Sequence, residues 1–463
     1  MNNLILNTDS YKTSHYLQYP PGTQYVSSYI ESRGGEFTAS LFFGLQMFIK
    51  QYLTHAITRE DIDEAAALYE LHGVPFNQAG WEHILQAHQG LLPIKIEAIK
   101  EGTVLPTRNV MVQIINTDPA CAWLTCFVET ALLRAIWYPT TVATVSHACK
   151  QVIAKYMRET AGHTEGLAFK LHDFGARGVS SLESAAIGGL AHLVNFQGTD
   201  TVSALVQGRQ FYGEAMAGFS IPASEHSTMT SWGQSRETEA YQNMLEQYGG
   251  PGKTVAVVSD SYDIWHAIDH IWGRELRQQV INHGGTLVVR PDSGDPVSMV
   301  SDVIERLMKQ FGHRYNAVGF KVLPDFLRVI QGDGVSLTTI EQILVEMKRR
   351  QLSVENIAFG MGAELLQKVN RDTLKFAMKA SAVGINGEWI DVYKDPITDP
   401  GKKSKAGRLA LIQQNGQYQT IRASELSGRQ NLLKPVFLNG RLLKECTLKE
   451  VRAQQQLTGQ KAA

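Results

Sequence analysis

The chain has 463 residues, 43% of them hydrophobic and 9% aromatic, so it is long enough for two or three domains with sizeable cores. Its 44 lysines and arginines balance 45 aspartates and glutamates, and there is no basic tail, which argues against nucleic acid as a partner. No apolar run approaches the roughly 18 residues that a membrane helix needs, so we also expect no membrane partner.

The N-terminus and the cysteines bear on localisation and redox state. The opening sequence MNNLILNTDSYK has no charged start followed by an apolar core, so we expect no signal peptide and a cytoplasmic protein. The cysteines lack C-x-x-C spacing, which predicts reduced thiols rather than a disulfide framework or a zinc site. They are Cys121, Cys126, Cys149 and Cys446.

The first third of the chain mixes helical and strand patterns. Residues 41–54 and 58–72 have helical spacing, and Thr58 begins the second of these with the pattern of a capping box. The spacing changes to that of strands over residues 91–117 and returns to that of long helices over residues 120–160. This combination predicts an α+β module.

Eight short apolar runs follow in the middle of the chain, most of them separated by segments with helical periodicity. This alternation predicts a (β/α)8-type barrel over residues 164–384. An open doubly wound sheet is the alternative, but no G-x-G-x-x-G opens a helix here. The runs are Ala168–Leu171, His192–Phe196, Phe219–Ile221, Val255–Val258, Leu287–Val289, Leu327–Ile330, Ile357–Phe359 and Phe376–Met378.

Beyond about residue 385 the pattern changes again. The stretch DVYKDPITDPGKKSKAGR is polar and rich in proline, glycine and lysine, which predicts a loop, and short strand-like pieces with a Gln-rich tail follow it. This piece is too small for a core of its own. We therefore expect residues 385–463 to pack on residues 1–163 as one module.

The stretch GFSIPASEHSTMTSW, residues 218–232, has a short apolar run that stops at Pro222 and is followed by Glu225 and His226. A histidine just past a strand end is a candidate functional residue, because imidazole is the side chain that can change charge near neutral pH. A structural histidine at a strand–helix junction is the alternative explanation. The functional interpretation gains weight because polar turns follow several other strands in this half of the chain.

In a barrel, ligands bind where the strands end, and carboxylates, arginines and glycines collect there in this sequence. Aspartate and glycine are ordinary turn residues, which explains any one of them, but not Arg290 and Asp292 beside a buried strand. Charges of both signs suit an anionic ligand that carries a divalent cation. The residues past the strand ends include His172, Phe174, Arg177, Asp200, Ser259, Asp260, Asp263, Gly332, Asp333, Gly360 and Gly362.

Chemistry suggests a role for several of these. The glycines could present backbone N–H groups to a phosphate. Asp263, Asp292 and Asp333 could hold ribose hydroxyls or, through water, Mg²⁺, while Phe174 could stack on a planar ring or belong to the core. No Ser-His-Asp order, H-E-x-x-H or P-loop sequence is present, which leaves hydrolase, metalloprotease and P-loop functions with little support.

Several motifs resemble, in matching order across nearly the whole chain, the nicotinamide phosphoribosyltransferase family. They are TDSYK, YIESR, LHDFGARGVSS, NFQGTDTV, PASEHST, VVSDSYDI, RPDSGDP, VIQGDG and YKDP. The resemblance implies an irregular α/β barrel with a module from both chain ends, in a homodimer whose active sites lie at the subunit interface. It also implies the substrates nicotinamide and phosphoribosyl pyrophosphate, and nicotinamide mononucleotide and pyrophosphate as products in NAD salvage.

The resemblance assigns the ring site first. Phe174 and Tyr11 of the partner subunit would sandwich the pyridine ring, Asp200 would accept from the carboxamide NH₂, and Arg290 would face its oxygen. A carboxylate at position 200 would repel nicotinate. Asp292, Ser259, Gly332, Asp333, Gly362, Arg177 and Arg371 would bind the rest of the substrates, and Arg33, His172, Lys379, Lys394 and Lys402 the pyrophosphate or ATP.

His226 matches the family's phosphorylated histidine, which takes its phosphate from ATP and acts through Mg²⁺, and Glu225 could orient it. The transfer itself needs no nucleophilic side chain, because it depends on positioning and on stabilising separated charge. One departure is Ala363, where the family has a further glycine, followed by Glu364. An alanine with positive φ there would cost about 1 kcal/mol or more, and the added carboxylate would weaken binding of the 5-phosphate.

Three other functions compete with this assignment. Nicotinate transfer on the same fold is disfavoured by Asp200. An aldolase or isomerase would need a Schiff-base lysine, and Lys379 is the one late-strand candidate. A non-catalytic pyridine-binding protein would not need His226 or the paired arginines and aspartates.

Overall fold

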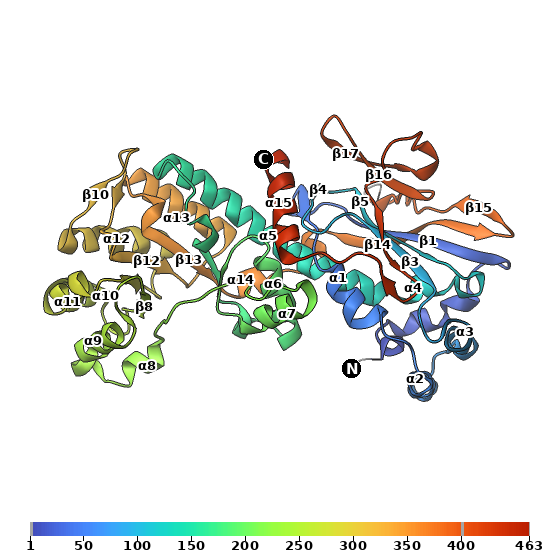
Figure 1. The fold of residues 1–463 in the computed structure, drawn as a ribbon, viewed down its shortest axis with the longest axis horizontal. Helices are drawn as coiled ribbons and strands as arrows, with labels where there is room; N and C mark the ends of the chain where they lie inside the picture. The colour runs from blue at the N-terminus through green and yellow to red at the C-terminus, as the bar shows by residue number, and fades with distance from the viewer. Residues whose placement is uncertain (1–2, 400–401, 463) are drawn as a thin grey trace. The chain divides into compact units, whose positions relative to one another are not determined.

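The computed structural model describes residues 3–399 and 402–462, which form two compact units (Figure 1). Unit 1 comprises Met1–Thr144, Gly208–Glu214 and Asn370–Ala463, and unit 2 comprises Val145–Gln207 and Ala215–Val369. The sequence places these bounds at 163/164 and 384/385. The bounds differ because helix α5 (Glu129–Thr160) runs across the observed bound at 144/145, and strand β14 (Phe376–Ile385) pairs with a strand of unit 1.

Unit 1 is built on a seven-stranded sheet with the order β15-β14-β1-β5-β3-β18-β19. Strand β1 pairs antiparallel with both β14 and β5, so that Ser28 lies opposite Ala380 on one side and Ile114 on the other. Both chain ends therefore share one sheet. The strands are β1 (Thr23–Ser32), β3 (Ile94–Ala98), β5 (Val110–Asn116), β14 (Phe376–Ile385), β15 (Glu388–Asp391), β18 (Lys434–Leu438) and β19 (Arg441–Leu442).

Helices cover this sheet and share its core. Thr58 caps α2 as predicted: its hydroxyl accepts from the Asp61 N–H, and the Asp61 carboxylate accepts from the Thr58 N–H. Tyr29, Trp81 and Phe376 are among the core residues. The further elements are α1 (Leu45–Phe48), α2 (Arg59–His72), α3 (Gln78–His88), α4 (Leu124–Phe127), α15 (Leu448–Ala462), and the pairs β2 (Ala39–Leu41) with β4 (Val104–Pro106) and β16 (Leu409–Gln414) with β17 (Gln417–Arg422).

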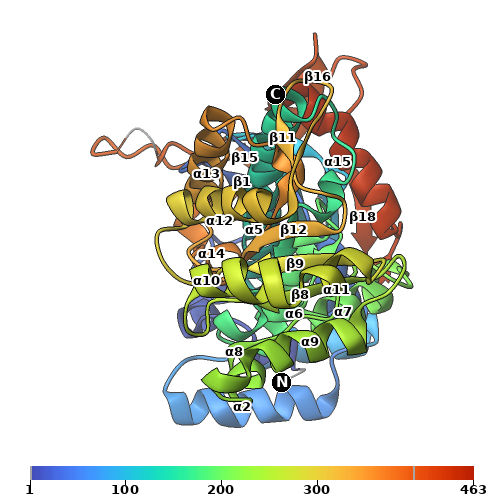
Figure 2. The same ribbon diagram turned by 90° about the vertical axis from the view of Figure 1, so that its left-hand side faces the viewer.

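Unit 2 is built on a parallel sheet with the order β7-β6-β13-β12-β9-β8, of which β8, β9 and β12 lie side by side in Figure 2. Two isolated parallel bridges, Gly198 to Phe219 and Ala223 to Ala256, join its edge strands through residues 219–223. Seven parallel segments therefore close an irregular ring. The strands are β6 (Leu171–Asp173), β7 (Gly198–Thr199), β8 (Thr254–Val258), β9 (Thr286–Arg290), β12 (Leu327–Gln331) and β13 (Ile357–Met361).

Two of the eight expected barrel strands are wrong, and a third is displaced. The expected strand Ala168–Leu171 overlaps β6 only at Leu171, because Leu167–Phe169 forms a short 3-10 helix before it. Phe376–Met378 belongs to β14, whose ten residues form part of the antiparallel sheet of unit 1. Its early alternation of buried and half-exposed residues fits such a sheet better than a fully buried barrel strand. His192–Phe196 is the end of α6 and the turn after it, and the strand starts only at Gly198. A short apolar run does not by itself distinguish a strand from a buried helix end.

Helices follow most barrel strands, and α12 illustrates why they form. Asp295 caps it by accepting from the Ser298 N–H at 3.0 Å, Pro296 occupies its first turn, and Gly312 ends it with a φ of +83°. Its buried residues recur at helical spacing. The helices are α6 (Leu182–His192), α7 (Val202–Tyr212), α8 (His226–Thr230), α9 (Glu237–Tyr248), α10 (Ile264–His266), α11 (Arg277–Asn282), α12 (Pro296–Phe311), α13 (Leu337–Arg349) and α14 (Ala363–Leu366), and β10 (Arg314–Tyr315) pairs with β11 (Lys321–Val322).

Helix α5 (Glu129–Thr160) is the longest of the described helices and contains Pro139. No single described helix is long and apolar enough to cross a membrane. The segments Pro119–Phe127 and Glu129–Thr160, bent by 44°, meet those length and composition criteria only when taken together.

Candidate active site

His226 lies in a hydrogen-bonded cluster at the carboxyl ends of β8 and β9. Its Nε2 is 3.0 Å from Oδ1 of Asp260, and its Nδ1 is 3.7 Å from Oδ2 of Asp292. The other oxygen of Asp260 accepts from the Asp292 N–H at 2.9 Å and from the Ser293 hydroxyl at 2.5 Å. The Asp260 side chain is only 3% exposed, whereas that of His226 is 43% exposed. A buried carboxylate therefore orients an imidazole that remains accessible.

Arg290 is the last residue of β9, and it forms a charged pair with Asp292 two residues later. Arg290 Nη2 is 3.6 Å from Oδ2 of Asp292, and both side chains are largely buried. Within the described residues, the buried Nε of Arg290 has no hydrogen-bond partner. A buried guanidinium N–H without a partner is costly, so this atom favours a ligand that accepts a hydrogen bond.

The Phe174 ring packs against the backbone of two glycines, Gly360 and Gly332. A Cβ added at Gly360 would lie 2.0 Å from Cε2 of the ring, and one added at Gly332 would lie 3.4 Å from the same atom. The Phe174 N–H donates to the Met361 carbonyl at 2.9 Å, which fixes the backbone beneath the ring. The structure thus explains Gly360 by the room it leaves for an aromatic ring.

Asp200 and Phe174 line one cavity of about 730 Å³ inside the ring of strands. Arg290 lines it at the carboxyl ends of the strands, and Thr254 and Thr286, the first residues of β8 and β9, line it at the opposite ends. The cavity therefore extends along the length of the barrel. Its mouth combines a ring face, an acidic acceptor and a cationic donor.

Asp200 is held at this mouth by its neighbours. Its N–H donates to the Asp173 carbonyl at 2.9 Å, and its Oδ1 accepts from the Ser220 hydroxyl. Burial raises the pKa of Asp173, directly beneath, to about 6. His172 also lines the cavity, with Nε2 3.1 Å from the Phe169 carbonyl, and burial lowers its pKa.

Three predicted site residues of unit 2 have structural partners. Glu225 caps α8 and its carboxylate accepts from Ser227, whereas the carboxylate that is hydrogen-bonded to His226 is that of Asp260. Asp263 caps α10, where its Oδ1 accepts from Trp265 and His266 N–H groups at 2.8 and 3.2 Å. Ser259 is fully buried, donates to the Val257 carbonyl at 3.0 Å and accepts from Trp272 Nε1 at 3.1 Å.

Gly332 lies close to Asp292, because a Cβ added at Gly332 would be 3.7 Å from Oδ1 of Asp292. The side chains of Arg177 and Asp333 are exposed. Gly362 is the residue before α14 and has a φ of −89°.

Ala363 and Glu364 fit the fold without strain. Ala363 is the first residue of α14 and is not among the described residues with positive φ, so the cost expected for an alanine in a left-handed conformation does not arise. Glu364 pairs with Lys368 one turn later, which partly neutralises the added carboxylate.

Unit 1 gathers three of the predicted phosphate ligands into a basic cluster. Burial lowers the pKa of the Lys379 ammonium, and the charges of Arg33, Lys12 and Lys394 lower it further against the opposing charge of Glu129. Mutually repelling cations of this kind favour an anionic ligand.

Tyr11 and Arg371 line a recess of unit 1, of about 260 Å³, together with Arg134. The Tyr11 side chain is 60% exposed. Lys402 pairs with Asp399 at 3.1 Å.

Sequence patterns gave Asp260 no role beyond its position at a strand end, although its place two residues after Val258 was available as a signal. They missed Lys170 completely. Its half-buried side chain donates from Nζ to the carbonyls of Val354 and Ile357, both at 2.8 Å, and burial lowers its pKa to about 7. It lines the cavity, and no motif marks it.

Comparison with known families identifies two matching segments. The profile described as "Nicotinate phosphoribosyltransferase (NAPRTase) family" matches residues 169–441. The profile described as "Nicotinamide phosphoribosyltransferase, N-terminal domain" matches residues 3–96. The first covers more than half of the chain and includes the whole ring of strands.

Curated relatives match over nearly the whole chain. A nicotinamide phosphoribosyltransferase of Xanthomonas campestris pv. campestris is 53% identical over 460 residues, 98% of each chain. One of Acinetobacter baylyi is 32% identical over 483 aligned positions, 96% of this chain and 95% of its own.

Solved structures at lower identity share the fold. A nicotinate-nucleotide pyrophosphorylase of Pyrococcus furiosus has a TM-score of 0.62 and 16% identity, over 100% of this chain and 97% of its own. Human nicotinic acid phosphoribosyltransferase has a TM-score of 0.56 and 16% identity, over 98% and 93%. These likenesses confirm the mixed α/β fold class.

Proposed function

This chain belongs to the nicotinate phosphoribosyltransferase family, and we propose that it transfers the 5-phosphoribosyl group of phosphoribosyl pyrophosphate to nicotinamide. The products are nicotinamide mononucleotide and pyrophosphate, in NAD salvage. The observation that carries the proposal is the mouth of the barrel cavity, where Phe174, Asp200 and Arg290 offer a ring face, an acceptor and a donor. A planar pyridine with a carboxamide matches all three.

Asp200 sets the preference for the amide over the acid. Its carboxylate accepts a hydrogen bond from an NH₂ group, whereas the carboxylate of nicotinate would meet it as a like charge. Arg290, with its unpartnered Nε, donates to the carboxamide oxygen. The two contacts together orient the ring across the face of Phe174.

The transfer exchanges one bond at the ribose C1′ for another. The bond from C1′ to the pyrophosphate oxygen breaks with its electron pair, and the pyridine nitrogen forms the new bond, so the product ring carries a positive charge. The chain's part is to align the ring nitrogen with C1′ and to stabilise the separated charge. Asp292, which lies beside Gly332, would hold the ribose.

We further propose that His226 accepts the γ-phosphate of ATP. Asp260 holds one ring nitrogen, so the other keeps the lone pair that attacks phosphorus while ADP leaves. Asp260, Asp292 and the Ser293 hydroxyl supply the hard oxygen donors that Mg²⁺ prefers, so the residues present fit this ion. Bound there, Mg²⁺ would neutralise phosphate and pyrophosphate charge.

A homodimer with shared active sites completes the proposal. Tyr11 and Arg371, together with the basic cluster of Arg33, Lys379 and Lys394, would serve the site of a partner chain. Mixing a Tyr11→Ala chain with a Phe174→Ala chain tests this. Recovery of activity in the mixture, above the sum of the two variants, is expected; no recovery would leave each chain with its own complete site.

The main test uses the purified protein with phosphoribosyl pyrophosphate, Mg²⁺ and either nicotinamide or nicotinate, with and without ATP. Both mononucleotides are quantified. Nicotinamide mononucleotide alone, increased by ATP, is expected, and His226→Ala should remove the increase while keeping basal transfer. Nicotinate mononucleotide as the main product would overturn the role of Asp200, and stimulation that survives His226→Ala would overturn the phosphohistidine.

A further inference from the structure

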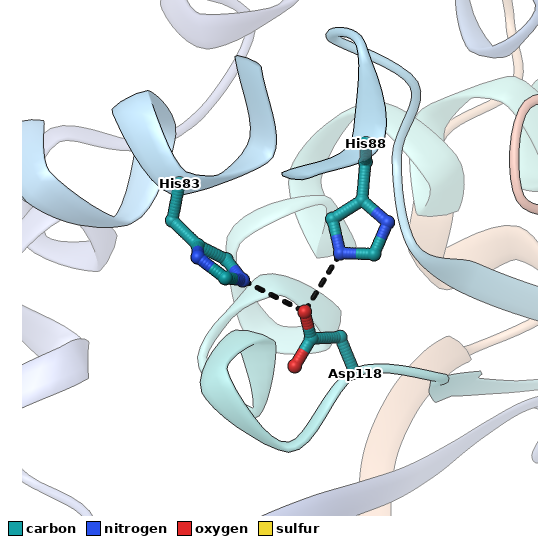
Figure 3. Close-up of side chains that lie close together, drawn as sticks. All are labelled: His83, His88 and Asp118. Carbon is teal, nitrogen blue, oxygen red and sulfur yellow. Dashed lines mark hydrogen bonds and ion pairs between the residues drawn. The ribbon is translucent and has the colours of Figure 1, made fainter. Parts of the chain in front are cut away.

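Two imidazoles and one carboxylate converge in unit 1, among elements without an assigned role (Figure 3). His83 and His88 come from helix α3, and Asp118 precedes the short helix Pro119–Cys121. The Nε2 atoms of both histidines lie 2.7 Å from the same oxygen, Oδ2 of Asp118. In the part of the chain that the structure describes, this is the one group of three such side chains whose ligand atoms all lie within 4.8 Å of one another.

Hydrogen bonds outside this group hold Asp118 in place. Its Oδ1 accepts from the Ala120 N–H at 2.9 Å, and the Asp118 carbonyl accepts from Asn116 Nδ2 at 2.8 Å. Asn116 is itself buried, and its Oδ1 accepts from the Val26 N–H at 2.8 Å in strand β1. Outer hydrogen bonds of this kind orient the first ligands of metal sites.

The histidines are also on a rigid element. Trp81, on α3, is fully buried and packs edge-on against Trp123, with 5.0 Å between the ring centroids. This contact holds the helix against the segment that follows Asp118. His88 is the last residue of the helix, where the partial negative charge of the unpaired carbonyls favours a cation. All three side chains remain partly exposed, so an ion can enter.

We propose that His83, His88 and Asp118 form a binding site for a divalent transition-metal ion, best suited to zinc. Two imidazoles and one carboxylate are the set that three-ligand zinc sites use, with a fourth position open to water. Imidazole selects zinc over magnesium or calcium, which prefer oxygen. At bond lengths of about 2.0–2.2 Å, tetrahedral ligand atoms lie roughly 3.3 Å apart, so the side chains would separate by about half an ångström.

Without an ion, the same geometry is a pair of hydrogen bonds in which each imidazole donates from Nε2. Burial raises the pKa of Asp118, but hydrogen bonds from His83 and His88 outweigh this and lower it to about 2. The carboxylate is therefore ionised at neutral pH and ready to act as a ligand. To bind a metal through Nε2, each neutral imidazole would carry its proton on Nδ1 instead, and the ion would link α3 to the end of β5, stabilising unit 1.

The test is zinc binding to the full chain, freed of metal by dialysis against a chelator and carrying no affinity tag. ZnCl₂ is titrated in competition with a chromogenic zinc chelator, and thermal unfolding is followed with and without zinc. Wild type should bind one equivalent and gain thermal stability. His83→Gln, His88→Gln and Asp118→Asn should each weaken binding more than about 100-fold and lose the thermal shift.

The matched control is His72→Gln, because His72 is an exposed histidine at the end of α2. This variant should bind zinc as wild type does. Asp118→Asn keeps the oxygen that caps Ala120 but replaces the charged acceptor of both histidines by an amide, so the zinc-dependent shift of each variant is measured against its own unfolding without zinc. When CoCl₂ is added instead of zinc, wild type should show the visible absorption of a tetrahedral ion. The variants of the three ligands should not show it. Equal zinc affinity in wild type and all three variants, or no zinc held against the chelator, would overturn the site.

Discussion

Replacing Gly360 with alanine tests whether the ring of Phe174 is the surface on which nicotinamide stacks. The added Cβ would lie 2.0 Å from Cε2 and 2.2 Å from Cδ2 of the ring, whereas carbon atoms pack at about 3.5–4.0 Å. The strand cannot yield easily, because Gly360 is paired with His172 in the parallel sheet. The ring must therefore move away from its present position.

The magnitude follows from the cost of overpacking. Forcing a methyl group into a packed site costs about 1–3 kcal/mol, and the variant escapes that cost when the ring rotates out of the cavity. Nicotinamide binding must bring the ring back, so its affinity should fall by about 5- to 150-fold. Calorimetric titration with nicotinamide measures this, and the KM for nicotinamide should rise in parallel.

A double-mutant cycle with Phe174→Ala supplies the control. In that background the ring is absent, so Gly360→Ala should have little further effect on nicotinamide affinity. Full additivity of the two changes, or an unchanged affinity in Gly360→Ala alone, would refute the stacking role. Urea unfolding of the single variant separates a local change from loss of the fold.

Three further predictions concern the neighbouring carboxylates. Asp260→Asn should lower ATP-stimulated transfer about 10- to 100-fold by losing a charged partner of His226, with basal transfer retained; equal losses with and without ATP would contradict a positioning role. Asp200→Ala should lose the preference for nicotinamide over nicotinate, and Ser220→Ala should change it less because the carboxylate remains; unchanged discrimination in Asp200→Ala would remove the charge explanation. Because the folded pKa of Asp173 is about 6 and its unfolded value is about 4, the folded chain binds more protons between them and this group's contribution to stability is lost as the pH rises. Asp173→Asn should remove about 2–3 kcal/mol of that pH dependence, measured by urea unfolding at about pH 4 and about pH 7; parallel curves for both proteins would contradict it.

Local patterns in the sequence determined much of the site. Thr58 and Asp61 specified a capping box, because that interaction spans three residues. The apolar runs located five of the barrel segments. The residues that end or follow the barrel strands include Phe174, Asp200, Arg290 and His226, near the cavity or its mouth. Parallel strands in a ring end on one side, so residues that follow them necessarily gather there.

Tertiary structure decided what depends on partners distant in the chain. The pairing of β14 with β1 joins residues more than 300 positions apart, and nothing in FAMKASAVGI states which strand will lie beside it. Likewise, the sequence could not predict that Asp260 contacts His226 across 34 positions, or that Gly360 leaves room for Phe174. His83, His88 and Asp118 have no recognisable spacing, and only the packing of α3 beside the end of β5 brings them together. Short-range hydrogen bonds and periodicity are written in the sequence, whereas contacts across the core depend on which surfaces pack best together.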